Sequence, residues 1–292
     1  MLKPDASYRV GWQLRLLYAY VREGSVNWAI GRTLAYIESR VYHLLAGPRR
    51  QIDEDWDVLI ICDALRADAV DTLQLPDGEK RTVKTAGLWS LPWLKQCIEG
   101  HDRTDTVYVG ANAYIEYIDT GGLFARYITF APETDGVDRV HPAAVCQLAQ
   151  EAAEAHPDKR LIVHFMQPHI PFFVDGEPMR NVWERVRSGE LDDATLRERY
   201  HENVAFVRPY VHELIETLPG KIVVTADHGE NLGERRLGVK RYGHSHWTPE
   251  CVYVPWVILP HRERTDVRHG EPIERKPEES SVEEQLALLG YR

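Results

Sequence analysis

The stretch DVLIICD (residues 57–63) decides the fold, together with a second stretch, KIVVTADHGE (residues 221–230). Each begins as a short run of β-branched and other apolar residues and leads into a carboxylate. Apolar runs this short are typical of buried parallel strands, and open parallel sheets place their ligand sites at the carboxyl ends of the strands. We therefore expect Asp63, Asp227 and His228 to meet at one metal ion.

A simpler interpretation exists for these carboxylates. An Asp after a strand often forms a turn or caps the next helix, and residues 64–72 have a helical pattern that Asp63 could cap. The run DHGE (residues 227–230) is harder to explain in this way, because it places a carboxylate beside an imidazole and follows them with a glycine. The capping alternative stays open for Asp63.

From Trp56 onward, apolar runs alternate with helical patterns. Strands are predicted near residues 57–62, 106–110, 160–165, 221–226 and 252–258, and helices near 64–72, 91–99, 142–155, 194–217 and 281–289. This order indicates an α/β fold, a three-layer sandwich with a mostly parallel central sheet and helices on both faces. Polar loops at residues 119–139 and 174–192 are expected to surround the site, and residues 261–280 to form a surface connection.

Residues 1–50 differ from the rest and are expected to form a basic, amphipathic helical segment before a catalytic domain over residues 51–292. The segment has eight Lys or Arg against three acidic residues, a net charge of +5 in a chain whose total is −10. Apolar spacing predicts helices over residues 10–22 and 27–45. The segment could contact an anionic membrane surface or hold a lipid-linked substrate. The alternative is that its apolar stripe packs on the catalytic domain.

The composition limits the class of protein. A net charge of −10 argues against general nucleic-acid binding. Four scattered cysteines, without metal or disulfide spacing, indicate buried thiols in a reducing compartment. No apolar run approaches the ~20 residues that span a bilayer, and the N-terminus lacks the pattern of a secretory leader. We therefore expect a cytoplasmic protein, with peripheral contact to the inner membrane face if residues 1–50 bind lipid.

Ser90 is the candidate nucleophile beside the metal. It stands in the run GLWSLPWL (residues 87–94), where Pro92 suits the first turn of a helix and places Ser90 at its N-terminus. The helix dipole and a coordinated metal would both favour the Ser90 alkoxide there. A serine that only caps the helix is the alternative, and Thr85 is the reserve nucleophile.

Several short motifs together resemble the alkaline phosphatase superfamily in its sulfatase-like branch. They are DALRAD (63–68), SLP (90–92), QPH (167–169), DHGE (227–230) with GE (233–234), and GH (243–244), in this order. The tail LALLGY (286–291) is similar to the tail of many sulfatase-like proteins. The resemblance covers about residues 56–259. It implies an alkaline-phosphatase-like fold and an enzyme that hydrolyses or transfers an ester of phosphate or sulfate.

The resemblance also implies the metal ligands. A first site maps to Asp63, Ser90, Asp227 and His228. A second site in the family combines an Asp and a His four residues apart with a later His. His169 and His244 fit the two imidazoles, but Phe165 occupies the carboxylate position, and His164 is the substitute to consider. His169 and His244 therefore either complete a second site or bind the substrate's oxyanion. We expect one or two divalent ions, with Zn or Mn favoured and Mg or Ca permitted.

Two departures from the sulfatase pattern favour phosphate. Sulfatases resemble one another in a Cys-x-Pro-x-Arg motif and in paired aspartates, whereas here Ser90 and Ala64 occupy those positions. A serine matches the phosphatase, phosphodiesterase and phosphotransferase members and implies a phosphoserine intermediate. Asn112 is placed like an oxyanion-binding Asn of the family, or is a turn residue. Arg66 either neutralises substrate charge or forms a structural ion pair.

These observations predict a metal-dependent phosphoesterase or phosphotransferase. Its substrate is expected to be a small-molecule, glycan-linked or lipid-linked phosphate ester, with no nucleic acid. Two other functions stay open: a sulfatase that uses a hydroxyl nucleophile, and a non-catalytic binding protein whose metal is structural.

Overall fold

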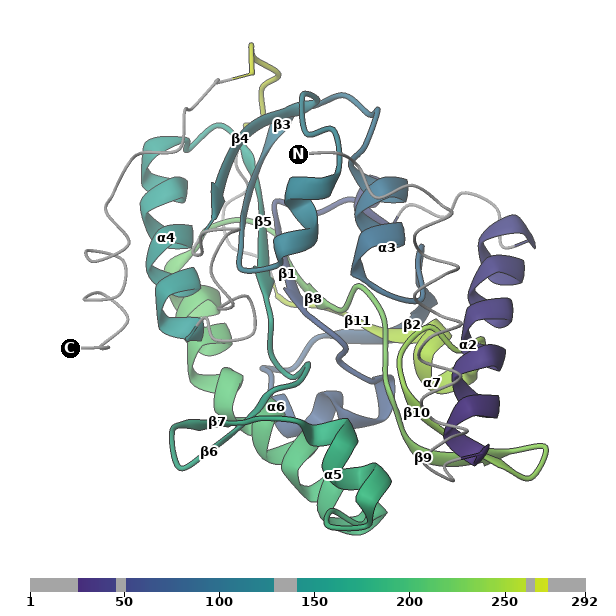
Figure 1. The fold of residues 1–292 in the computed structure, drawn as a ribbon. Coiled ribbons are helices and arrows are strands. Elements are labelled where there is room, and N and C mark those ends of the chain that lie inside the picture. The colour runs from purple at the N-terminus through teal and green to yellow at the C-terminus, as the bar shows by residue number, and fades with distance from the viewer. Residues whose placement is uncertain (1–25, 46–50, 129–140, 261–265, 273–292) are drawn as a thin grey trace.

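The structure is a computed structural model that describes residues 26–45, 51–128, 141–260 and 266–272. A seven-stranded sheet of order β2-β11-β8-β1-β5-β3-β4 forms its centre (Figure 1). Strands β8, β1, β5, β3 and β4 are parallel, and β11 runs antiparallel between β8 and β2. The bounds are β1 (Val58–Cys62), β2 (Glu79–Lys84), β3 (Arg103–Gly110), β4 (Leu123–Ile128), β5 (Arg160–Phe165), β8 (Ile222–Thr225) and β11 (Tyr253–Ile258).

Helices cover both faces of the sheet. Helices α4 (Pro142–Ala155) and α6 (Asp193–Thr217) pack on one face, and α3 (Ser90–Cys97) packs on the other (Figure 1). The remaining elements are α2 (Val26–Leu45), α5 (Val182–Ser188), α7 (Pro249–Val252), the 3-10 helices η1 (Gln51–Asp53), η2 (Ala67–Leu73) and η3 (Ala113–Tyr117), and the hairpins β6 (Phe172–Val174) with β7 (Glu177–Met179) and β9 (Asn231–Arg236) with β10 (Val239–Gly243). The predicted three-layer α/β sandwich is therefore confirmed.

Strand β1 lies at the middle of the sheet and is buried along its whole length. Successive side chains of a strand point to opposite faces, so Val58 and Ile60 join the core under α4 and α6, whereas Leu59 and Ile61 join the core under α3. Burial on both faces explains why this strand reads as an unbroken apolar run. Its parallel neighbours β5 and β8 end at the same edge, so the residues after these strands meet.

The prediction of a helix over residues 64–72 is wrong. Ala64 adopts a φ of 63°, in the left-handed region, so the chain turns immediately after Asp63. Only the short 3-10 helix η2 follows, and its N-cap is Arg66. Asp63 therefore caps no helix, which removes the simpler interpretation of this carboxylate.

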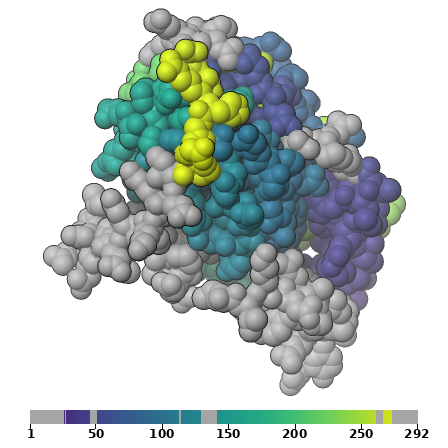
Figure 2. All heavy atoms as spheres, turned by 90° about the horizontal axis from the view of Figure 1, so that it is seen from above, coloured from purple at the N-terminus to yellow at the C-terminus, as the bar shows by residue number. Residues whose placement is uncertain are grey.

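Several other predictions differ from the structure or fall outside it. The expected rim loops contain regular elements: β4 in the first, and β7 and α5 in the second. Residues 266–272, yellow in Figure 2, cross the surface, where the Arg268 N–H donates to the Asp158 carbonyl at 2.9 Å. The predicted helices over 10–22 and 281–289 and the tail 286–291 lie outside the described residues.

Helix α2 confirms the helix predicted over residues 27–45 and packs on the rest of the described α/β domain. Trp28 stacks on Tyr242 of β10 with ring centroids 4.9 Å apart, and the Tyr42 hydroxyl donates to the Thr85 carbonyl at 2.7 Å. Glu38 binds Arg241 and His246, each at 3.0 Å. The inner face of α2 therefore packs on the rest of the protein, as the alternative to membrane contact predicted. In the part of the chain that the structure describes, no helix is long and apolar enough to cross a membrane.

Candidate metal centre and active site

Four side chains that the sequence predicts to share a metal lie together at the carboxyl ends of β1 and β8. Asp63 follows β1, Asp227 and His228 lie just after β8, and Ser90 is the first residue of α3; all four are buried. His228 Nε2 lies 3.3 Å from Asp63 Oδ1 and 3.5 Å from Asp227 Oδ2. Ser90 Oγ lies 3.1 Å from Asp63 Oδ2 and 3.5 Å from His228 Nε2.

These spacings fit a divalent ion. Four ligands at about 2.0–2.1 Å from a tetrahedral ion lie about 3.3–3.4 Å from one another. Within the described residues, Asp63 Oδ1 and Asp227 Oδ2 are buried and have no hydrogen-bond partner. Burying two unpartnered carboxylate oxygens side by side is costly unless a cation lies between them. The donor set of carboxylates, imidazole and hydroxyl suits Zn²⁺ or Mn²⁺.

Hydrogen bonds hold the remaining atoms of these ligands in place. Asp227 Oδ1 accepts the backbone N–H groups of Ala64 at 3.3 Å and His228 at 2.9 Å. His228 Nδ1 donates to the Gly229 carbonyl at 2.9 Å, so that Nε2 is the nitrogen left to bind a metal. A side chain at Gly229 would come within 2.0 Å of the Glu250 carbonyl oxygen, so this close approach of two backbones requires glycine.

The electrostatics of the centre are those of one imidazole between two carboxylates. Burial alone would raise the pKa of Asp63, but the imidazoles of His169 and His228 outweigh it and hold that pKa below its usual value. Burial also opposes the charged form of His228, yet Asp227 and Asp63 raise the pKa of His228 to about 10. An ion that binds here must therefore displace a proton from His228.

The hydroxyl of Ser90 is directed at the metal centre and does not cap α3. The N-cap residue is Trp89, and no side chain of the described ranges caps this helix end. Thr85 is a poorer nucleophile in this geometry, because its hydroxyl lies between the carbonyl oxygens of Asp227 and Gly87, which can only accept hydrogen bonds. Ser90 is therefore the better placed of the two hydroxyls.

Asn112 and Arg66 both make structural contacts close to the site. Asn112 Nδ2 donates to Asp63 Oδ2 at 2.9 Å, while Asn112 Oδ1 accepts the Tyr114 N–H at 3.0 Å and caps η3. Its binding of a substrate oxyanion stays a prediction. The Arg66 guanidinium pairs with Asp68 and Glu234, each at 2.6 Å, so the geometry favours the structural ion pair over substrate binding.

A second cluster lies beside the first and consists of His169, Glu230 and His244. One ligand atom from each side chain lies within 4.8 Å of the other two. Glu230 Oε1 and His244 Nδ1 are 3.5 Å apart, and both atoms are buried with no hydrogen-bond partner in the part of the chain that the structure describes. His169 Nδ1 donates to the Ile170 carbonyl at 2.7 Å, which leaves Nε2 for a ligand. This cluster has the composition of a second cation site.

Glu230 is the member of this cluster that sequence reasoning missed. The family pattern places the carboxylate four residues before His169, where this chain has Phe165, a fully buried core residue. The sequence feature that could have identified Glu230 is the DHGE run (residues 227–230), of which it is the final residue. It lies on the turn into β9, close to His244. Burial works to raise the pKa of Glu230, but His244 and His169 outweigh it and keep that pKa below its usual value.

His164 belongs to the first centre and not to the second. It is fully buried on β5, where Nδ1 lies 2.8 Å from the Tyr108 hydroxyl and Nε2 lies 3.7 Å from Asp227 Oδ2. His164, Asp63 and Asp227 form a group that could hold an ion. Of the two places considered for His164, the geometry therefore favours the first centre over the second site.

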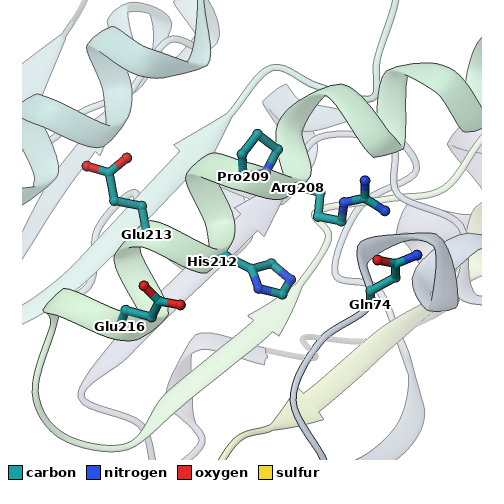
Figure 3. A pocket seen from close by; sticks show the side chains of 6 residues that line it. All are labelled: Gln74, Arg208, Pro209, His212, Glu213 and Glu216. Atoms are coloured by element: carbon teal, nitrogen blue, oxygen red, sulfur yellow. The ribbon is translucent and has the colours of Figure 1, made fainter.

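A surface depression of about 450 Å³ lies elsewhere, along α6 beside the end of η2 (Figure 3). It is lined by Gln74, Arg208, Pro209, His212, Glu213 and Glu216. His212 is already engaged, because its Nε2 lies 2.8 Å from the Leu73 carbonyl oxygen. None of the proposed ligands or nucleophiles lines this depression, so it is separate from the chemistry described above.

A model of the sulfatase family matches residues 81–279, which is more than half of the chain. The matched range includes Ser90, Asp227 and His228, whereas Asp63 precedes it. No curated protein is significantly similar to the chain. The subcellular compartment stays a prediction from the sequence.

Several solved structures are similar to the chain at low sequence identity. The C-terminal periplasmic domain of EptC from Escherichia coli, in complex with Zn, is 15% identical with a TM-score of 0.50, over 73% of this chain and 75% of that one. The integral membrane protein lipooligosaccharide phosphoethanolamine transferase A (EptA) from Neisseria meningitidis is 16% identical with a TM-score of 0.49, over 86% and 59%. A 2-O GAG sulfatase is 13% identical with a TM-score of 0.48, over 69% and 63%. The first of these similarities shows a common fold.

We predict that the affinity of the metal-free protein for Zn²⁺ rises about tenfold per pH unit between about pH 7 and 9, because His228 must release its proton. The same shift predicts that the imidazolium stabilises the metal-free fold. That contribution is complete below the unfolded pKa of 6.5 and is lost as the pH rises through about 10. Competition against a chelator at constant ionic strength measures the affinity. An affinity that does not change over this range would contradict the assignment of His228.

Proposed function

The chain belongs to the sulfatase family of alkaline-phosphatase-like enzymes, and on this basis we propose that it is a metal-dependent hydrolase or transferase of phosphate esters. The position of Ser90 carries this proposal. Its Oγ lies 3.1 Å from Asp63 Oδ2 and 3.5 Å from His228 Nε2, at the first position of α3. A hydroxyl in this place is a nucleophile beside a metal ion, and it fits phosphoryl transfer.

The reaction follows from the placement of Ser90. A divalent ion held by Asp63, Asp227 and His228 would supply Lewis acidity that lowers the pKa of the hydroxyl and neutralises charge on the phosphoryl group. The N-terminus of α3 also favours negative charge on Oγ. Ser90 Oγ attacks phosphorus while the bond to the leaving oxygen breaks, which gives a phosphoserine. Water or an acceptor alcohol then attacks the same phosphorus and releases Ser90.

His169, Glu230 and His244 support a second divalent ion in this proposal. Direct binding of a substrate oxyanion by the two imidazoles is less favourable, because the buried Glu230 carboxylate would repel the negatively charged oxygen. A cation bound by Glu230 removes this repulsion and leaves a positive charge that attracts the phosphoryl oxygens. The unpartnered atoms of Glu230 and His244 are consistent with such an ion.

We predict that Ser90→Ala lowers kcat/KM for an aryl phosphate by about 10³-fold or more while the Zn²⁺ content changes little. Asp63, Asp227 and His228 still bind the ion, but the nucleophile is lost. Ser90→Thr should keep partial activity, since it retains a hydroxyl with a more restricted rotamer. The wild type, stopped in acid during turnover of labelled ester, should carry phosphate on the Ser90 peptide.

The same assay separates the rival functions. Aryl phosphate, aryl phosphodiester and aryl sulfate are offered in parallel, with and without an acceptor alcohol. Faster turnover of the sulfate would identify a sulfatase, and no turnover of any ester by the metal-loaded protein would identify a binding protein. Undiminished turnover by Ser90→Ala, with no trapped phosphate, would reject the covalent mechanism.

We also predict that Glu230→Gln reduces the bound Zn²⁺ from two ions to one per chain, because an amide replaces the only carboxylate of the second cluster. Elemental analysis after dialysis measures this number. Glu271→Gln, an exposed carboxylate that lies outside both clusters, is the matched control and should keep both ions. Two ions in the Glu230→Gln protein, or one ion in the wild type, would show that the second cluster holds no metal.

A further inference from the structure

Helix α2 carries a second apolar stripe on the side that faces away from the catalytic domain. Val26, Ile30, Ile37 and Leu44 are spaced by four and seven residues, so they lie on one face of the helix. Their exposed fractions are 52%, 42%, 50% and 82%. Apolar side chains that gather on one exposed face of a helix mark an interaction surface more often than isolated ones do.

The tip of the β9–β10 hairpin adds another exposed apolar side chain beside this stripe. Leu237 is fully exposed, and it occupies a turn position with a φ of 49°, where Asn or Gly is usual. Strand β10 packs directly on α2, as the Trp28–Tyr242 stack shows, and the hairpin tip extends past the N-terminal end of the helix (Figure 1). Figure 2 shows α2, in purple, at the right-hand side of the molecule, where Figure 1 also places it.

We call Val26, Ile30, Ile37, Leu44 and Leu237 the outer flank. Its charged neighbours are basic: Arg40, three residues after Ile37 and four before Leu44 on α2, and Arg235, which donates to the Gly238 carbonyl at the hairpin turn. The single acidic residue of α2, Glu38, points inward and pairs with Arg241 and His246. This flank is therefore apolar and positively charged in a protein whose net charge is −10.

We propose that the outer flank docks on the surface of an anionic lipid bilayer. Apolar side chains flanked by arginines suit the boundary between acyl chains and anionic headgroups. A partner helix could cover the stripe on α2, but a planar surface can contact both the stripe and the hairpin tip. The docking does not depend on the reaction proposed for Ser90.

One consequence does rest on that proposed function. Tyr42, on the inner face of the same helix, donates its hydroxyl to the Thr85 carbonyl and packs against Leu88 and Trp89, which lead directly to Ser90. The loop that leads to Ser90 therefore packs directly beneath the helix that docks. The substrate class that this favours is a phosphate ester carried by a lipid.

Sedimentation of the full chain with lipid vesicles tests the docking without any substrate. The chain should bind vesicles that contain phosphatidylglycerol more tightly than vesicles of phosphatidylcholine alone, and salt should weaken the binding. Ile37→Asp and Leu237→Asp should each reduce the partition coefficient by about tenfold. Tyr117→Asp, at another exposed apolar side chain that is 52% exposed on η3, should bind as the wild type does.

Light scattering and thermal unfolding complete the test. Absence of binding to anionic vesicles, or unchanged binding by both variants, would overturn the proposal. A dimer that Ile37→Asp dissociates would assign the flank to a second copy of the chain. A large fall in Tm of Ile37→Asp without lipid would assign the stripe to the chain's own packing. Leu237→Asp, at a fully exposed turn, keeps the vesicle test valid even if Ile37→Asp does not fold.

Discussion

The arrangement of the site depends on two carboxylates, Asp63 and Asp227, that the sheet forces together. Strands β1 and β8 are paired in parallel register, with Val58 beside Ile222 and Ile61 beside Thr225, so their carboxyl ends meet at one edge. Two buried negative charges that lie on either side of one imidazole nitrogen, 3.3 and 3.5 Å from it, repel each other strongly in a low-dielectric interior. The fold can keep both of them ionised only by supplying positive charge, from the His228 imidazolium or from a metal ion.

The hydrogen bonds divide each carboxylate into an anchored oxygen and a free one. Asp227 Oδ1 accepts two backbone N–H groups, and Asp63 Oδ2 accepts Asn112 and Ser90, whereas Asp63 Oδ1 and Asp227 Oδ2 have no partner among the described residues. Such a division orients ligands before an ion binds, which lowers the cost of binding. It also places the Ser90 hydroxyl against a proposed metal ligand, where a bound ion would activate it.

Much of this centre could be predicted from sequence because it depends on local patterns. The apolar runs of β1 and β8 identify buried strands, and the residues that follow each run must then share an edge of the sheet. Glu230 could not be found in this way, since its contact with His244 depends on how the β9–β10 hairpin folds back. Strand β2 was missed because its sequence, EKRTVK, is exposed at the sheet edge and has no apolar periodicity. The left-handed backbone conformation of Ala64 excludes the predicted helix. Contacts with residues distant in sequence hold this conformation, because the Ala64 N–H donates to Asp227 Oδ1 and its carbonyl accepts the Tyr200 hydroxyl.

Anomalous scattering from crystals grown with Zn²⁺ would show whether Asp63, Asp227, His228 and Ser90 hold one divalent ion. We expect a zinc peak at about 2.0–2.1 Å from Asp63 Oδ1, Asp227 Oδ2 and His228 Nε2, with Ser90 Oγ as the fourth ligand or its nearest neighbour. A map with these side chains in place and no zinc peak between them would show that they form no metal site, and a peak bound to His164 in place of His228 would show that the ligand set is different.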